Sequence, residues 1–180
     1  MKKQTKPAVE KKPSAENIMR KVKIEKIIIS CSGTAQELEK GKKLLEFLSG
    51  KHAQKIASTK RIPDFGVRPG LEVGVRITLR GAEAIALLKR LLGAIDNILD
   101  EDQIAENSFS FGIKEYIEIP GIEYQRDIGI RGLNVTVVFI RPGVRTKRKK
   151  IKAGKLGKKQ YVSPNEIITY MVNNFSTEVK

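Results

Sequence analysis

The 180-residue sequence has few of the side chains on which most catalytic and metal sites depend. Its one Cys, Cys31, excludes an internal disulfide and a Cys-rich zinc site, and it fits a reducing compartment. Its one His, His52, excludes most nucleophile–base pairs and His-based metal sites. No apolar run approaches the roughly 18 residues of a membrane helix, and the basic N-terminal residues lead into no apolar stretch typical of a secretory signal. The composition predicts an intracellular protein that is not an enzyme and uses no metal or cofactor.

Positive charge is what the sequence has in excess. Thirty-five Lys and Arg residues stand against 20 Asp and Glu, which gives a formal net charge of +15. Residues 141–160, here called the basic segment, hold ten of the cations and no acid, so they carry +10 of that charge. Such a segment repels itself and buries little apolar surface. We therefore expect it to be disordered or extended when free, and to bind a polyanion through its phosphates. A solvated tail or a nuclear-type address is the alternative interpretation.

The rest of the chain shows patterns typical of strands and helices. In residues 72–80, apolar side chains alternate with Glu72, Arg76, Thr78 and Arg80, which is typical of a half-buried strand with a basic open face. Residues 60–71 contain two Pro and two Gly and predict a loop, protruding and shaped by its glycines. By the same kinds of pattern, further strands are expected over 22–30, 55–59, 109–119 and 133–141, and helices over 34–50, 81–99 and 163–175.

These elements predict an α+β fold in which helices cover one face of an antiparallel sheet and the other face stays open. The last helix begins with Ser163-Pro164-Asn165-Glu166, a capping box with Pro at the first helical position. Composition changes at Arg141-Pro142-Gly143. We therefore divide the chain into a flexible N-terminal arm (1–17), an α+β RNA-binding domain (18–143), a basic extension (144–162) and a C-terminal helix and tail (163–180).

Basic residues around the 72–80 strand form a second candidate phosphate surface. The strand contributes Arg76 and Arg80. The preceding loop contributes Lys60, Arg61 and Arg68, and Lys51 and Lys55 come before that loop. Together they predict an extended surface that contacts RNA phosphates. With no Trp, four Tyr and six Phe, stacking platforms are weakly supported, and recognition of folded RNA by shape and 2′-hydroxyls fits better. An RNA-modifying enzyme and an architectural DNA-binding protein are the alternatives. The acidic triplet 100–102 is expected to be a solvated helix end.

Three stretches resemble the universal large-subunit ribosomal protein L-five family, whose members bind 5S rRNA. They are NIMRKVKIEKIIIS (17–30), GKHAQKIASTKRIPDFGVRPGLEVGVRITLRG (50–81) and NSFSFGIKEYIEIPGIEYQRDIGIRGLNV (107–135). Arg141-Pro142-Gly143, the basic segment and the capped last helix are similar to the archaeal and eukaryotic branch. The resemblance covers about residues 17–175.

The resemblance implies an RRM-like α+β fold whose open sheet face grips 5S rRNA. It implies a structural constituent of the large subunit of the cytoplasmic ribosome, which helps to attach 5S rRNA in the central protuberance. The implied partners there are 23S-type rRNA and a neighbouring 5S-binding ribosomal protein. The loop 64–73 takes the place of the family's loop near the P-site tRNA. A contact with a head protein of the small subunit across an intersubunit bridge is also implied.

Carried over residue by residue, the resemblance places the family's RNA-contacting strand Thr at Thr78. Lys51 replaces the family's turn Gln, Ser30 replaces its strand-end Asn, and Cys31-Ser32-Gly33 replaces Gly-Val-Gly. With the charge pattern, the residues expected to bind 5S rRNA are Lys26, Ser30, Lys51, Lys55, Lys60, Arg61, Arg76, Thr78 and Arg80. The expected tRNA-proximal loop is Asp64, Phe65, Gly66, Val67, Arg68, Pro69 and Gly70. The expected rRNA-phosphate tail is Arg145, Lys147, Arg148, Lys149, Lys150, Lys152, Lys155, Lys158 and Lys159.

Overall fold

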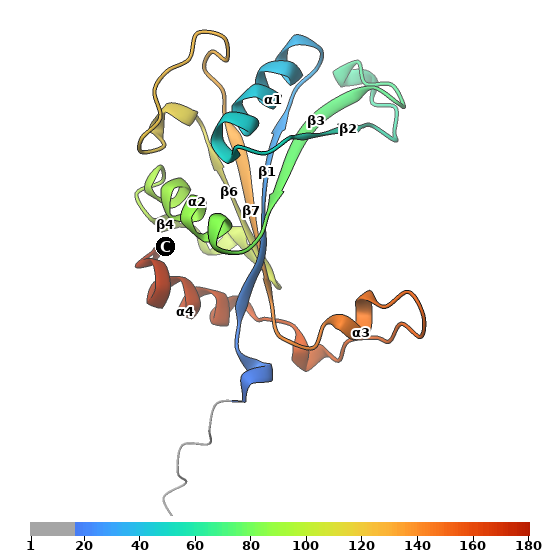
Figure 1. Ribbon diagram of the computed structural model, residues 1–180, viewed down its shortest axis with the longest axis vertical. Coiled ribbons are helices and arrows are strands. Elements are labelled where there is room, and N and C mark those ends of the chain that lie inside the picture. Colours follow the sequence, from blue (N-terminus) through green and yellow to red (C-terminus); the bar gives the residue numbers. More distant parts are fainter. Residues whose placement is uncertain (1–16) are drawn as a thin grey trace, which may run out of the picture.

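A computed structural model describes residues 17–180 (Figure 1). The N-terminal arm expected at 1–17 lies outside the described residues except for Asn17. One six-stranded sheet organises the chain, in the order β2-β3-β1-β7-β6-β5, and all its neighbouring strands are antiparallel. Its strands are β1 (Lys23–Ser32), β2 (Gln54–Ala57), β3 (Glu72–Leu79), β5 (Ile104–Ala105), β6 (Ser108–Ile113) and β7 (Leu133–Ile140).

The longer helices lie on one side of this sheet (Figure 1). The longer ones are α1 (Gln36–Ser49), α2 (Ala82–Gly93) and α4 (Pro164–Phe175), and a short α3 (Arg145–Arg148) lies in the basic extension. With β4, β5 and β6 set aside as insertions between α2 and β7, the succession β1-α1-β2-β3-α2-β7 and the strand order β2-β3-β1-β7 make the βαββαβ arrangement. This confirms the α+β prediction. Single 3₁₀ turns cover Ile18–Arg20, Pro63–Phe65, Glu101–Gln103, Tyr116–Glu118 and Lys158–Gln160.

The core lies between the sheet and its helices. Alternate residues of β3 and β7 are buried, including Val75 and Val137, and they face leucines of α1 and α2 such as Leu45 and Leu88. The helix α1 approaches β1 closely at Gly41, where an added Cβ would come within 3.2 Å of the Cβ of Cys31. Because one face of each strand is covered and the other is not, the alternating pattern of the sequence appears directly as two different faces of the sheet.

The helix predicted over 81–99 is shorter than expected, because α2 ends at Gly93. Asp96 and Asn97 adopt positive φ angles of 52° and 58°, a left-handed conformation that Asp and Asn tolerate better than most residues. The chain then forms β4 (Ile98–Leu99), which pairs in parallel with β8 (Glu178–Val179). Helical spacing in the sequence groups Ile85 with Leu88 and Leu92 as a core stripe, but Ile85 is 40% exposed, while Leu87 and Leu91 are buried.

The strand predicted over 109–119 is also too long, because β6 ends at Ile113. Lys114 and Glu115 are consecutive charged residues that interrupt the alternation, and a 3₁₀ turn follows at Tyr116–Glu118. The Tyr116 side chain is fully buried, and its hydroxyl oxygen accepts a hydrogen bond of 2.9 Å from the backbone N–H of Gln125. Tyr116 therefore anchors the loop that returns to β7.

The sequence predicted a basic segment that is disordered or extended when free, but the segment is not extended throughout. It contains α3 and the 3₁₀ turn Lys158–Gln160, and its first residue, Arg141, is buried. Arg141 pairs with Glu166 in the first turn of α4 and donates to the backbone carbonyl of Lys159 at 2.9 Å. The predicted helix start at Ser163 is confirmed, and the Ser163 backbone N–H donates to the Glu166 carboxylate at 3.1 Å. A contact between elements far apart in the sequence thus fixes both ends of the basic extension.

Burial raises the pKa of the Cys31 thiol to about 11, although the charge of Arg131 acts in the opposite direction. At pH 8 only about one thiol in a thousand is then ionised, and only the thiolate is a good nucleophile. We expect iodoacetamide to alkylate Cys31 on the order of 100-fold more slowly in the folded chain than in urea, as measured by mass spectrometry. Equal rates in the two conditions would contradict the buried position of Cys31.

Within residues 17–180, none of the helices combines the length and the apolar character needed to span a membrane. The acidic triplet lies at the 3₁₀ turn Glu101–Gln103, where Asp100 accepts a hydrogen bond of 3.0 Å from Gln103. In the same described part of the chain, no three His, Cys, Asp or Glu side chains converge on a possible metal position.

Candidate nucleic-acid interface

The uncovered side of the sheet, here called the open face, carries two rows of side chains. Strand register places Ser30 of β1 opposite Arg76 of β3 and Asn134 of β7. The next row has Ile28 between Thr78 and Thr136. Gln54, Gly112 and Ser110 extend these rows, and Lys26 lies opposite Val138 one step further along β1 and β7. None of these open-face positions is Asp or Glu, so the surface offers hydroxyl, amide and guanidinium groups to an anionic partner.

Most polar side chains of the open face are accessible to solvent. Arg76, Thr78 and Asn134 are exposed, and Ser30 is half-buried. Gly112 provides room for its neighbour, since an added Cβ would lie 3.3 Å from the side-chain oxygen of Asn134. Within residues 17–180, neither Arg76 nor the exposed Arg80 just after β3 has a carboxylate partner. Their charges are therefore available to phosphates without first breaking an ion pair.

Two of the predicted RNA-binding lysines are placed elsewhere. Lys51 follows α1 and pairs with Glu83 in the first turn of α2. Lys55 lies opposite the buried Val75, hence on the side of the sheet that the helices cover, and it pairs with Glu72 at 2.7 Å. The hydrogen bond to Glu72, together with its charge, raises the pKa of Lys55. A phosphate would have to compete with a carboxylate for each of these lysines.

The loop between β2 and β3 is a structured hairpin. Ile62 and Val67 exchange two backbone hydrogen bonds of 3.0 Å, and Ser58 and Leu71 close its base at 2.8 Å. Gly66 and Gly70 adopt positive φ angles of 63° and 85°, which confirms that glycines shape this loop. The side chain of Phe65 is 77% exposed at the 3₁₀ turn, whereas that of Val67 is buried. The predicted Lys60, Arg61 and Arg68 are exposed on the same hairpin.

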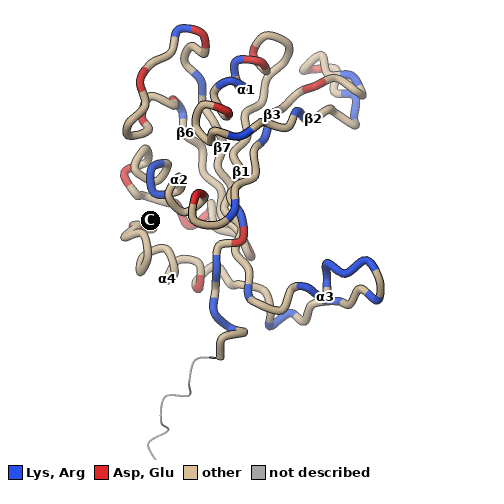
Figure 2. Tube along the Cα trace, viewed as in Figure 1, with Lys and Arg blue, Asp and Glu red and all other residues tan. Residues whose placement is uncertain are grey.

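The basic extension projects from the end of the sheet as a loop. Figure 2 shows its Lys and Arg residues concentrated along the part that contains α3. Among the described residues, Arg148 is the one predicted tail residue with a carboxylate partner, and it pairs with Glu25 of β1, whose side chain is 15% exposed. This pair and the pair Arg141–Glu166 connect the extension to the sheet and to α4.

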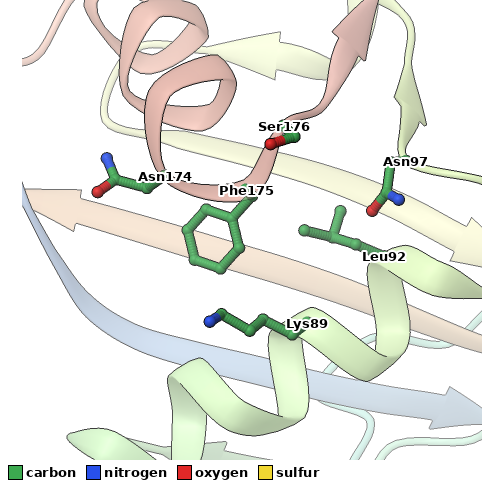
Figure 3. Close-up of a pocket in the computed structure, with 6 residues that line it drawn as sticks. All are labelled: Lys89, Leu92, Asn97, Asn174, Phe175 and Ser176. Atoms are coloured by element: carbon green, nitrogen blue, oxygen red, sulfur yellow. The ribbon is translucent and has the colours of Figure 1, made fainter.

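A pocket of about 300 Å³ lies on the helical side of the sheet, between the ends of α2 and α4 (Figure 3). Leu92 and Phe175 provide its apolar lining, and Lys89 provides its charge. Amide and hydroxyl groups complete it: Asn97, Asn174 and Ser176. With one cation, and on the side of the sheet opposite to the open face, this pocket is not part of the candidate interface.

Several open-face residues were not among the predicted site residues. Asn134 and Thr136 lie beside Ser30 and Ile28, and Gln54 lies beside Arg76. The alternation of residues 133–141 could have identified Asn134 and Thr136, because they occupy the polar positions of that strand. Arg141 was counted only as one charge of the basic segment, and nothing near it in the sequence indicates its partner Glu166.

Comparison with known proteins identifies the family. A family model for the C-terminus of the ribosomal L-five family matches residues 72–159. Large ribosomal subunit protein uL5 of Nanoarchaeum equitans is 36% identical over 167 residues, which cover 91% of this chain and 99% of that protein. The chain belongs to the uL5 family. The uL5 proteins of Nitrosopumilus maritimus and Sulfolobus acidocaldarius are 38% and 34% identical and cover 92% and 91% of this chain, or 98% and 94% of their own.

Membership of the uL5 family settles the broad role. The protein is a structural, non-enzymatic constituent of the large ribosomal subunit, associates with rRNA in translation and is located in the cytoplasmic ribosome. The archaeal sources of these relatives agree with the resemblance of the basic segment to the archaeal and eukaryotic branch. The RNA-modifying enzyme and the architectural DNA-binding protein considered above are thereby set aside.

Proposed function

We propose that this protein binds 5S rRNA through the open face and helps to attach it in the central protuberance of the large subunit. The observation that carries the proposal is the row Arg76, Ser30 and Asn134, which strand register aligns across three central strands with no acid among them. A guanidinium, a hydroxyl and an amide side by side suit phosphates, 2′-hydroxyls and exposed base edges. The sequence resemblance supports 5S rRNA as the RNA.

The remaining partners of the proposal are assigned to separate parts of the molecule. The hairpin 58–71 extends from the sheet edge at β2 and β3, and its segment 64–73, with the exposed Phe65, is proposed to lie near the P-site tRNA. The basic extension is proposed to contact 23S-type rRNA through its phosphates. A neighbouring 5S-binding ribosomal protein and a head protein of the small subunit are the proposed protein partners.

Titration of labelled 5S rRNA with the full chain tests the proposal. Neutralising about six phosphates would lower the affinity by about 10³-fold between 50 and 200 mM salt. Duplex DNA of equal length should compete poorly at matched salt, because B-form geometry does not present the 2′-hydroxyls. Binding of 5S rRNA no tighter than binding of that duplex would refute the proposal.

Removal of residues 145–160 separates the two RNA surfaces. Because the open face remains, we expect the truncated chain to bind isolated 5S rRNA within about fivefold of the full chain at 150 mM salt, since the lost contacts are with phosphates of other rRNA. Its incorporation into large subunits lacking this protein should fall by at least about tenfold, as measured by sedimentation. Loss of 5S rRNA binding by the truncated chain would show that the basic extension, not the open face, is the main binding surface for that RNA.

A further inference from the structure

A groove of about 380 Å³ lies where the open face meets the basic extension. Val138 and Ile140 of β7 form its floor, and both are half-buried on the uncovered side of the sheet. Val144 and Leu156 of the basic extension line it from the other side, together with Tyr161, which is 38% exposed. Its volume falls within the range of about 300–1,000 Å³ that is typical of small-molecule sites. The groove therefore offers one half-open, largely apolar space with an aromatic side chain in its lining.

Charged groups surround this apolar space. Lys147 and Arg148 of α3 belong to the lining, and both are exposed. Glu25 of β1 is the acid of the lining, and Arg148 neutralises it in an ion pair. The basic segment that contributes these cations holds no acid, so an occupant of the groove lies beside strong positive charge. An apolar space with cations in its lining suits a ligand with one flat apolar part and one anionic part.

We propose that this groove binds an unpaired nucleotide of rRNA, with its base between the floor and Tyr161 and its phosphate beside Lys147. The proposal rests on the proposed function, since it specifies how the basic extension contacts the 23S-type rRNA assigned to it there. Proteins that recognise single-stranded RNA commonly stack an extruded base on an aromatic side chain. The groove is continuous with the open face. Val138 of its floor lies opposite Lys26 of β1, which belongs to that face.

An apolar side chain of a neighbouring protein is the competing occupant, and charge argues against it. A peptide that entered the groove would need acidic residues beside its apolar side chain to match the surrounding cations. A nucleotide carries both required parts itself, and each further nucleotide of the strand adds a phosphate that the basic extension can neutralise.

Methyl NMR of the full chain, titrated with AMP and separately with ribose 5-phosphate, tests the proposal. We expect AMP to shift the methyl signals of Val138, Ile140, Val144 and Leu156 in a saturable way. Ribose 5-phosphate should bind about tenfold more weakly, because it lacks the base that stacks. Tyr161→Ala should weaken AMP binding by about tenfold, while Tyr161→Phe keeps the ring and should stay within about twofold of the original chain.

Three outcomes would overturn the proposal. Equal affinity for AMP and ribose 5-phosphate would reduce the groove to a phosphate site, and unshifted methyl signals would place the nucleotide elsewhere. Tighter binding of N-acetyl-leucine amide than of AMP would assign the groove to a protein side chain. The wild-type comparison does not depend on the folding of any variant. If 5S rRNA still binds while AMP does not enter the groove, only this inference fails. Loss of 5S rRNA binding by the wild-type chain defeats the proposed function itself.

Discussion

Replacing Arg76 and Arg80 together by Glu is expected to lower the affinity for 5S rRNA by about 100-fold or more. Both side chains are exposed on or beside the open face, and neither has a carboxylate partner within residues 17–180. Each substitution removes a charge-assisted hydrogen bond worth about 1.5–3 kcal/mol and adds an anion that repels the phosphates. Filter binding at 150 mM salt measures the loss.

The matched control is Lys40→Glu with Lys43→Glu. These lysines are exposed on α1, which covers the opposite face of the sheet, and their replacement changes the net charge by the same amount. If long-range attraction alone held the RNA, the two double variants would bind equally weakly. We expect the α1 variant to stay within about tenfold of the wild type, because screening limits charge effects beyond about 10 Å. Wild-type affinity of the Arg76/Arg80 variant would refute the assignment of the open face.

The second large effect is expected on folding stability. Glu166→Ala should lower the free energy of unfolding by about 2 kcal/mol, because the Arg141 guanidinium would remain buried without a counter-charge. The Nε of Arg141 already lacks a hydrogen-bond partner, so the hydrogen bond to the Lys159 carbonyl would be the compensation that remains. The Ser163 backbone N–H would also lose its acceptor. In a chain of this size, such a loss lowers Tm by about 4–8 °C, which calorimetry detects.

Glu83→Ala is the control for this prediction. Glu83 also lies in the first turn of a helix and also pairs with a cation, but both side chains are largely exposed, at 69% for Glu83 and 49% for Lys51. Exposed ion pairs contribute about 0–1 kcal/mol, so its Tm should change little. The two variants lose a similar interaction with the helix dipole. A Tm loss no larger for Glu166→Ala than for Glu83→Ala would show that the ion pair of the buried Arg141 contributes no more stability than an exposed ion pair.

How far the sequence predicts this structure depends on how local each signal is. Strands β3 and β7 were found because their alternation is interrupted by neither charge pairs nor glycine turns. The end of α2 was missed because apolar residues at helical spacing, Ile95 and Leu99, continue past Gly93. The left-handed residues Asp96 and Asn97 prevent the helix from continuing.

The candidate interface divides in the same way. Arg76, Thr78 and Arg80 share a face by simple alternation, so the sequence was enough to group them. Lys51 and Lys55 were grouped with them by charge alone, and their partners Glu83 and Glu72 lie 32 and 17 residues away. Only the fold determines which cations such distant carboxylates neutralise. The RNA partner itself was indicated by the family resemblance, not by any single residue.

The central position of β1 has a consequence for synthesis on the ribosome. Among the described residues β1 is the first strand to be made, yet it pairs with β3 on one edge and with β7, about 110 residues later, on the other. A nascent chain that has reached residue 80 can form β2, β3, β1 and α1, but the second edge of β1 stays without a partner. That edge belongs to an isoleucine-rich segment, which is prone to pair with other chains. The period between the emergence of β3 and that of β7 is therefore when this protein most needs protection by chaperones.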